Sequence, residues 1–202
     1  ASQTTNTRRG PDTWRCVTCH GWDYQGVDGA FRSGSYSTGF PGLLEASSKD
    51  QSTLVEALDG SSDAQHNFTS MLSEDDIESV IAFIQTGLID DNEYIDIVTR
   101  KVIGGNLANG KEKYEQTCSS CHGDDGTLAT FRYEGVEVSL GTLAVQDPWR
   151  FLHRTRFGTA RAPEMPLGYE LGWTAEDGRD VVYYVQSSLP TGFEVPANEP
   201  ME

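Results

Sequence analysis

The chain has 202 residues, a hydrophobic content of 37% and a formal net charge of −16, from 15 basic and 31 acidic residues. This length suits two small domains of about 100 residues each, but the apolar content is low for two self-sufficient cores. The negative charge argues against binding nucleic acid or an anionic membrane, and no apolar run is long enough to predict a transmembrane helix. The acidity suits solubility, a cationic partner protein or a salt-rich habitat.

A short helix predicted over 13–20 carries the first informative motif, Cys-Val-Thr-Cys-His, which ends at His20. The pattern Cys-x-x-Cys-His is typical of c-type haem attachment. The two thiols form thioethers with the porphyrin vinyl groups, and the histidine supplies an axial nitrogen to the iron. The two-residue gap lets one helical turn present both sulfurs to the porphyrin edge. We therefore expect Cys16 and Cys19 to hold a haem c whose iron is bound by His20.

The rest of the first half predicts a loop and two helices. A glycine-rich loop over 21–42 precedes a short helix over 53–58. Ser73 is a favourable N-cap for a helix over 74–86, whose first turn is acidic, and Gly87 ends this helix. Its apolar residues recur at helical spacing, which predicts one buried stripe: Ile77, Val80, Ile81 and Ile84.

The second half repeats this order. A helix predicted over 108–118 leads into Cys-Ser-Ser-Cys-His, the second copy of the motif. It predicts a second covalent haem c, held by Cys118 and Cys121 and ligated by His122. The two motifs use all four cysteines of the chain.

Paired cysteines have two other common uses in proteins. A redox-active disulfide of the thioredoxin type belongs to a βαβ unit, and the chain shows no such alternation. A zinc ribbon would bring its two cysteine pairs much closer together in the sequence than they are here. Both alternatives are therefore weaker than haem attachment.

The elements after the second motif follow from turn and capping residues. In the loop that begins at Gly123, Val136, Val138 and Leu140 alternate with polar residues and indicate a short hairpin. Asp147 caps a helix that has Pro148 at its first position and ends near Phe157 and Gly158. Thr174 caps the last helix, which Pro190 stops. Its inward residues are expected to be Val181, Val182 and Val185.

On these motifs each half resembles a class I cytochrome c domain. The resemblance implies a mainly α fold with two tandem, loop-rich helical domains, each around one covalent haem. The expected boundaries are a first domain at 1–89, an acidic connector at 90–105, a second domain at 106–190 and a polar tail at 191–202. It also implies a distal iron ligand in the loop before each last helix.

Met165 is the distal candidate for the second haem. It lies in the loop before Thr174 and is followed by Pro166, as in the distal motif of the family that the domain resembles. A thioether ligand raises the reduction potential of haem iron. The alternative is that Met165 only fills the core, as methionines often do.

The first haem has two distal candidates, His66 and Met71. The position of His66 relative to the cap Ser73 is closer to that of Met165 relative to its own cap. Met71 lies almost at the cap and is not followed by proline. His66 is therefore preferred and Met71 is the alternative. A pair of histidines would give the first haem a lower potential than the second.

Other side chains suit supporting roles. His153 is read as a packing or propionate-bonding residue, with iron ligation as the weaker alternative. Tyr24 and Trp149 are candidates to bond a haem propionate. A local basic cluster could bind propionates or a partner, or simply form a solvated helix face: Arg150, Arg154, Arg156 and Arg161.

The sequence favours an electron carrier without catalytic residues: an exported, periplasmic dihaem cytochrome c that passes single electrons between redox proteins. Its partners are expected to present a basic docking face, and the oligomeric state is left open. A leader is expected to have preceded the N-terminus, because haem c is attached outside the cytoplasmic membrane. Three alternatives remain open: a dihaem peroxidase, a thiosulfate dehydrogenase and a subunit of a larger oxidoreductase complex.

Overall fold

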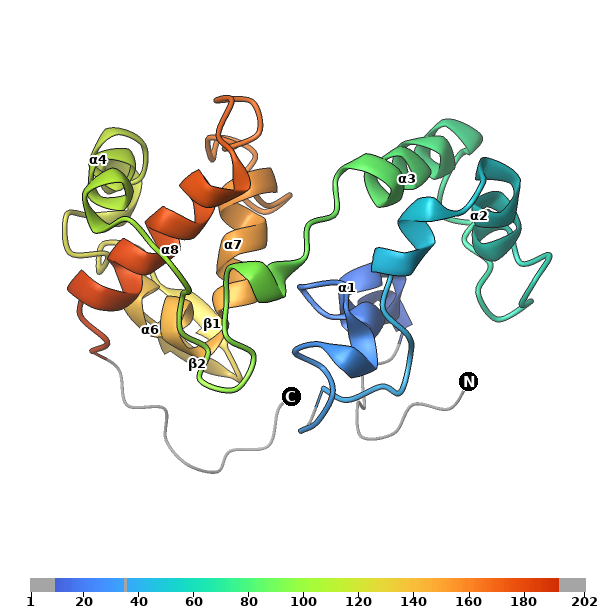
Figure 1. Cartoon of the computed structure of the whole chain (residues 1–202), viewed down its shortest axis with the longest axis horizontal. Helices are drawn as coiled ribbons and strands as arrows, with labels where there is room; N and C mark the ends of the chain where they lie inside the picture. Colours follow the sequence, from blue (N-terminus) through green and yellow to red (C-terminus); the bar gives the residue numbers. More distant parts are fainter. Residues whose placement is uncertain (1–9, 35, 193–202) are drawn as a thin grey trace. The chain divides into compact units, whose positions relative to one another are not determined.

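The computed structural model describes residues 10–34 and 36–192. The chain divides into two compact units, Ala1–Asp90 and Asp91–Glu202 (Figure 1). Helices dominate both units, and the prediction of a mainly α fold is confirmed. None of the described helices combines the length and the apolar character that crossing a bilayer requires.

Within residues 10–34 and 36–90, the first unit contains six short helical elements. They are the 3₁₀ helices η1 (Gly10–Trp14), η2 (Gly26–Asp28) and η3 (Leu44–Ser48), and the α-helices α1 (Cys16–His20), α2 (Gln51–Leu58) and α3 (Glu74–Thr86). The helix predicted over 13–20 is in fact two pieces, because Arg15 between them is extended, with φ −96° and ψ 123°. Only the haem motif itself forms α1.

Side-chain caps set the starts of α2 and α3. The carboxylate of Asp50 accepts a hydrogen bond from the Thr53 N–H at 2.8 Å. Ser73 caps α3 as predicted, and the Asp76 side chain accepts a hydrogen bond from the Ser73 N–H, which completes a reciprocal capping box. The two helices share an apolar cluster whose buried members are Leu54, Leu58, Ile77, Ile81 and Ile84. Three of the four residues of the predicted stripe are among them, and the fourth, Val80, is partly buried against the cluster.

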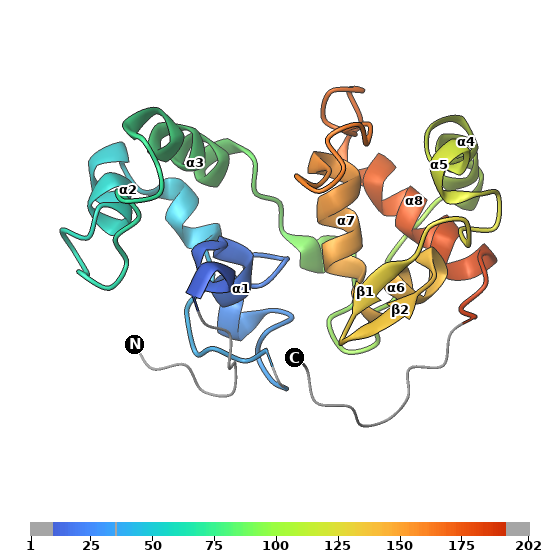
Figure 2. The same cartoon turned by 180° about the vertical axis from the view of Figure 1, so that it is seen from behind.

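The second unit has eight elements. They are η4 (Asp91–Glu93), α4 (Leu107–Thr117), α5 (Ser119–His122), β1 (Phe131–Tyr133), β2 (Val136–Val138), α6 (Leu140–Gln146), α7 (Pro148–Phe157) and α8 (Ala175–Ser188). The predicted hairpin exists, with Phe131 opposite Val138, and it lies against α6 in Figure 2. It ends earlier than the alternating pattern suggested. Ser139 accepts a hydrogen bond from the Thr142 N–H and starts α6, so Leu140 is helical.

The core of the second unit is the packing of α4 on α8, which lie side by side in both views (Figures 1 and 2). Gly110 sits at the closest approach: a Cβ there would overlap the carbonyl of Asp180. One turn later the rings of Tyr114 and Tyr184 pack with centroids 5.4 Å apart. The valines expected to face inward, Val181, Val182 and Val185, are all fully buried.

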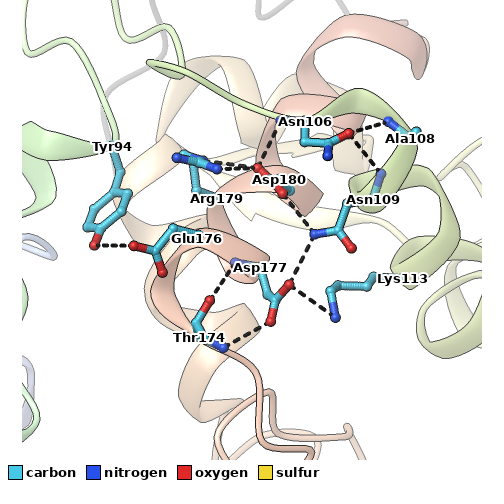
Figure 3. Close-up of polar contacts among 10 residues, drawn as sticks. All are labelled: Tyr94, Asn106, Ala108, Asn109, Lys113, Thr174, Glu176, Asp177, Arg179 and Asp180. Atoms are coloured by element: carbon cyan, nitrogen blue, oxygen red, sulfur yellow. Dashed lines mark hydrogen bonds and ion pairs between the residues drawn. The ribbon is translucent and has the colours of Figure 1, made fainter.

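Polar contacts pin the starts of α4 and α8 together, as Figure 3 shows. The Asn109 amide donates to Asp177 at 3.0 Å and to Asp180 at 2.8 Å. The buried Asp180 carboxylate also accepts from the Asn106 N–H at 2.9 Å and pairs with Arg179 at 2.8 Å. These contacts satisfy a carboxylate that would otherwise be costly to bury.

Of the predicted connector at 90–105, residues 91–105 belong to the second compact unit and contact its last helix. Ile95 is only 1% exposed and bridges to Val102. The side chain of Gln186 on α8 donates to the Arg100 carbonyl at 2.8 Å and accepts from the Val102 N–H at 3.2 Å. The acidic residues of this segment concealed its buried apolar side. Most of the predicted tail, residues 193–202, lies outside the described residues.

Candidate haem sites

Two histidines of the first unit face each other across a gap the size of a metal site. The ring centroids of His20 and His66 are 6.3 Å apart, and their planes are nearly perpendicular, at 88°. His20 ends α1, whereas His66 lies in the loop between α2 and α3. The structure therefore brings together two of the candidate iron ligands.

Each of these rings is tethered through Nδ1 to a backbone carbonyl. His20 Nδ1 lies 2.8 Å from the Pro41 oxygen, and His66 Nδ1 lies 2.5 Å from the Ala57 oxygen. A carbonyl can only accept, so Nδ1 carries the proton in both rings. The lone pair on Nε2 is then available to a metal.

The spacing fits an iron atom between the rings. A metal–imidazole bond is about 2 Å long, and bond lengths give the ring a radius of about 1 Å. Two imidazoles that hold one iron between them would have centroids roughly 6 Å apart, which agrees with 6.3 Å between His20 and His66. Burial lowers the pKa of His20, the hydrogen bond to Pro41 opposes this shift, and the neighbouring His66 adds a smaller lowering effect. A neutral imidazole is the form that binds iron.

Met71, the alternative ligand, lies in the turn before α3. Its side chain is 37% exposed, and its N–H donates to the Phe68 carbonyl at 2.9 Å. The contacts of the first unit therefore favour His66.

Burial dominates the environment of three of the four motif cysteines. It raises the pKa of Cys16 and of Cys19, and it raises the pKa of Cys118 to about 11. A redox-active disulfide needs the opposite shift, because the thiolate is the reactive form. The environment of these three cysteines therefore does not favour a thiol–disulfide centre.

In the second unit His122 lies at the end of α5, and burial lowers its pKa. Its ring centroid is 5.5 Å from that of Phe131. Within the described part of the chain, the buried Nδ1 of His122 and the buried indole N–H of Trp149 have no hydrogen-bond partner. Unsatisfied buried polar groups are rare, and a haem propionate would supply an acceptor for the Trp149 indole.

Met165 is half-buried in the segment between α7 and α8, where its N–H donates to the Ala162 carbonyl at 3.0 Å. His153 is half-buried on α7. Burial, reinforced by Arg156 and Arg154, lowers the pKa of His153 to about 4. It is therefore neutral at ordinary pH, which suits the packing role expected of it.

The sequence did not reveal that the carbonyls of Pro41 and Ala57 are the hydrogen-bond partners of His20 and His66. A backbone acceptor leaves no signature in residue type, and only the fold shows which carbonyl reaches a histidine.

The predicted basic cluster has contacts within the protein. Arg150 donates to the Arg132 carbonyl at 3.4 Å, and the Arg156 guanidinium lies 4.5 Å from the Phe157 ring centroid.

Comparison with known families agrees with this geometry. The family described as Cytochrome c matches residues 9–87 and again residues 107–188. The chain belongs to the cytochrome c family. It has two cytochrome c domains and accordingly carries two covalently bound haem c groups in a haem-binding, electron-transfer protein. A search of curated proteins found no match to this cytochrome.

Proposed function

We propose that this cytochrome is an exported dihaem electron carrier with unequal haems. In this proposal Cys16 and Cys19 hold haem 1, ligated by His20 and His66. Cys118 and Cys121 hold haem 2, ligated by His122 and Met165. The observation that carries the proposal is the facing pair of His20 and His66, 6.3 Å apart with both Nδ1 atoms tethered.

The hydrogen bonds to the histidines support a difference in potential. A ligating histidine that donates its Nδ1–H to a carbonyl is a more basic ligand, and a more basic ligand favours ferric iron. His20 and His66 both have such a bond, whereas none is formed by His122 within the described residues. The thioether of Met165 favours ferrous iron. Electron transfer from haem 1 to haem 2 would therefore be downhill.

In this role the chain alters no substrate. Its residues hold each iron with two protein ligands and exclude water from the porphyrin, and the haem supplies the reversible one-electron chemistry. Closed sixth positions set such a carrier apart from a peroxidase, which needs an open one. The net charge of −16 favours association with redox partners that present a basic docking face.

A spectroelectrochemical titration of the holoprotein tests the ligand assignment. We expect two resolved potentials, and His66→Ala should change the ferric spectrum and potential of the lower one only. Met71→Ala is the matched control and should leave both haems unchanged. A perturbed haem 1 in Met71→Ala, with His66→Ala unchanged, would reverse the assignment.

A second measurement tests the carrier role. The ferrous holoprotein should not bind carbon monoxide, and the ferric or mixed-valence protein should not turn over hydrogen peroxide. Rapid carbon monoxide binding, or peroxide turnover that survives purification, would instead identify a catalytic dihaem enzyme.

A further inference from the structure

We propose that two backbone carbonyls, those of Pro41 and Ala57, hold the imidazole planes of His20 and His66 perpendicular at haem 1, and that Gly26 is a positioning residue for this arrangement. The inference rests on the proposed ligation by His66. The proposed function names the two ligands of haem 1, whereas this inference concerns the angle between their rings, which affects the electronic structure of the iron.

The first tether belongs to the end of α2. The last carbonyls of a helix lack partners inside it, and the loop that follows α2 supplies them. Ser62 N–H donates to Glu56 at 3.0 Å and Phe68 N–H to Leu58 at 2.9 Å, while the His66 ring takes the intervening carbonyl of Ala57. The ring of His66 is thus part of a helix cap, which fixes its rotation.

Phe68 limits the same ring from another side. Its centroid lies 4.7 Å from that of His66, with the two planes at 87°. Phe68 is itself packed against the apolar cluster of α2 and α3. Rotation of the His66 ring would break the bond to Ala57 and disturb this edge-to-face contact.

The second tether belongs to the glycine-rich loop. Residues on either side of Pro41 are bonded to the segment that contains Gly26: Val27 N–H donates to Phe40 at 2.9 Å, and Leu43 N–H donates to Tyr24 at 2.7 Å. Thr38 also ties this loop to the haem motif by donating to the Cys19 carbonyl at 2.6 Å.

The close approach of these two segments requires glycine at position 26. Its φ is +53°, and a Cβ at this position would overlap the Phe40 oxygen and lie 2.6 Å from the Pro41 oxygen, both well inside van der Waals contact. A side chain at Gly26 must therefore displace this stretch of backbone, which includes the carbonyl that orients His20.

Perpendicular planes have a specific electronic consequence. Each imidazole donates π electrons to the iron d orbital that is normal to its own ring plane. Parallel rings raise one of two such orbitals and separate the pair in energy, whereas perpendicular rings raise both and keep them nearly equal. Ferric low-spin iron with nearly equal orbitals gives a strongly anisotropic electron paramagnetic resonance signal with one dominant feature at high g. Separated orbitals give a resolved rhombic spectrum with three features.

The first experiment uses the unmodified holoprotein. It is poised at a potential between those of the two haems, where haem 2 is reduced and gives no signal while haem 1 is still ferric. Haem 1 should show the single dominant high-g feature. A resolved rhombic signal from a haem 1 that His66→Ala still perturbs would overturn the inference while leaving the proposed ligand pair intact. A haem 1 that His66→Ala does not perturb would instead remove the ligand assignment itself.

The second experiment compares two glycines of the same loop. Gly26→Ala should cause loss of the high-g feature and the appearance of rhombic features at haem 1. Gly34→Ala is the matched control: its φ is +83°, so it introduces similar backbone strain, but a Cβ there meets nothing within 4 Å. The control should retain the parent signal. Identical spectra for the parent, Gly26→Ala and Gly34→Ala would show that Pro41 does not orient the ring.

Discussion

The hydroxyl of Tyr114 donates a hydrogen bond to the backbone carbonyl of Gly123, with 2.6 Å between the two oxygens. Tyr114 is completely buried on α4, and burial is the main reason that the pKa of its phenol is raised. Gly123 directly follows His122. One buried hydroxyl therefore connects the core helix of the second unit to the residue next to His122, the proposed proximal ligand.

Tyr114→Phe should destabilise the second unit by about 1–3 kcal/mol, because it leaves the Gly123 carbonyl without this donor. Thermal unfolding followed by far-ultraviolet circular dichroism would measure the loss. Tyr169→Phe is the control, since Tyr169 is 74% exposed and its variant should unfold with the parent. Equal stability of Tyr114→Phe and the parent would show that the bond contributes nothing.

The contact of α4 with α8 at Gly110 gives a second prediction. Gly110→Ala should destabilise the second unit by about 1–3 kcal/mol through overpacking, even though alanine is the better helix former. The obstacle is the Asp180 backbone, which cannot rotate away. Denaturant unfolding at fixed pH would measure it.

Gly178→Ala on α8 is the matched helical control for Gly110→Ala. Its new Cβ would meet the end of the flexible Leu152 side chain at 3.0 Å, and no backbone atom is among its nearest neighbours. We expect this variant to keep or gain stability. If both variants lost stability equally, backbone contact would not be the cause.

Two N-cap carboxylates should give opposite pH dependence. Burial raises the pKa of Asp147, the cap of α7, from 3.8 to about 6. The folded protein then holds the proton more tightly than the unfolded chain, so this contribution to stability is present below pH 3.8 and is lost as the pH rises through about 6. Between these values the stability of the parent should fall relative to Asp147→Asn, which retains a capping side chain.

Asp50, the exposed cap of α2, reverses this sign. Hydrogen bonds from Thr53 and Ser52 lower its pKa from 3.8 to about 2. Its contribution is present above pH 3.8 and is lost as the pH falls through about 2. Unfolding free energies of the parent, Asp147→Asn and Asp50→Asn as a function of pH would check both signs. Parallel curves for the three proteins would contradict the assignment.

The buried indole N–H of Trp149 gives a prediction about haem 2. If it donates to a propionate, Trp149→Phe removes a group that offsets negative charge near the iron, and the potential of haem 2 should fall while that of haem 1 stays fixed. Redox titration of the holoprotein measures both. Trp173→Phe is the control in the same unit, where the Lys113 ammonium lies over the ring at 4.9 Å from its centroid. A shift of both haems, or of neither in Trp149→Phe, would exclude this role.

Local signals in the sequence predicted much of the fold. Ser73, Asp147 and Thr174 each cap the helix expected of them, because a capping side chain bonds only to the next few residues. The sequence did not reveal α6, since the alternation through Leu140 suited a strand equally well. It also missed the tethers of His20 and His66, which depend on carbonyls that the tertiary fold delivers.

The apolar cluster of Leu54, Leu58, Ile77, Ile81 and Ile84 is built from α2 and α3, with neighbouring loops packed against it. Among the described residues, its members do not include the buried Val17 of the haem motif. In the second unit, by contrast, α4 runs directly into the motif and packs on α8. Before haem is attached, the second site would therefore be framed by packed helices, whereas the first depends on loop contacts such as the hydrogen bond from Thr38 to the Cys19 carbonyl. We expect the polypeptide to acquire its two haem groups on scaffolds of unequal order.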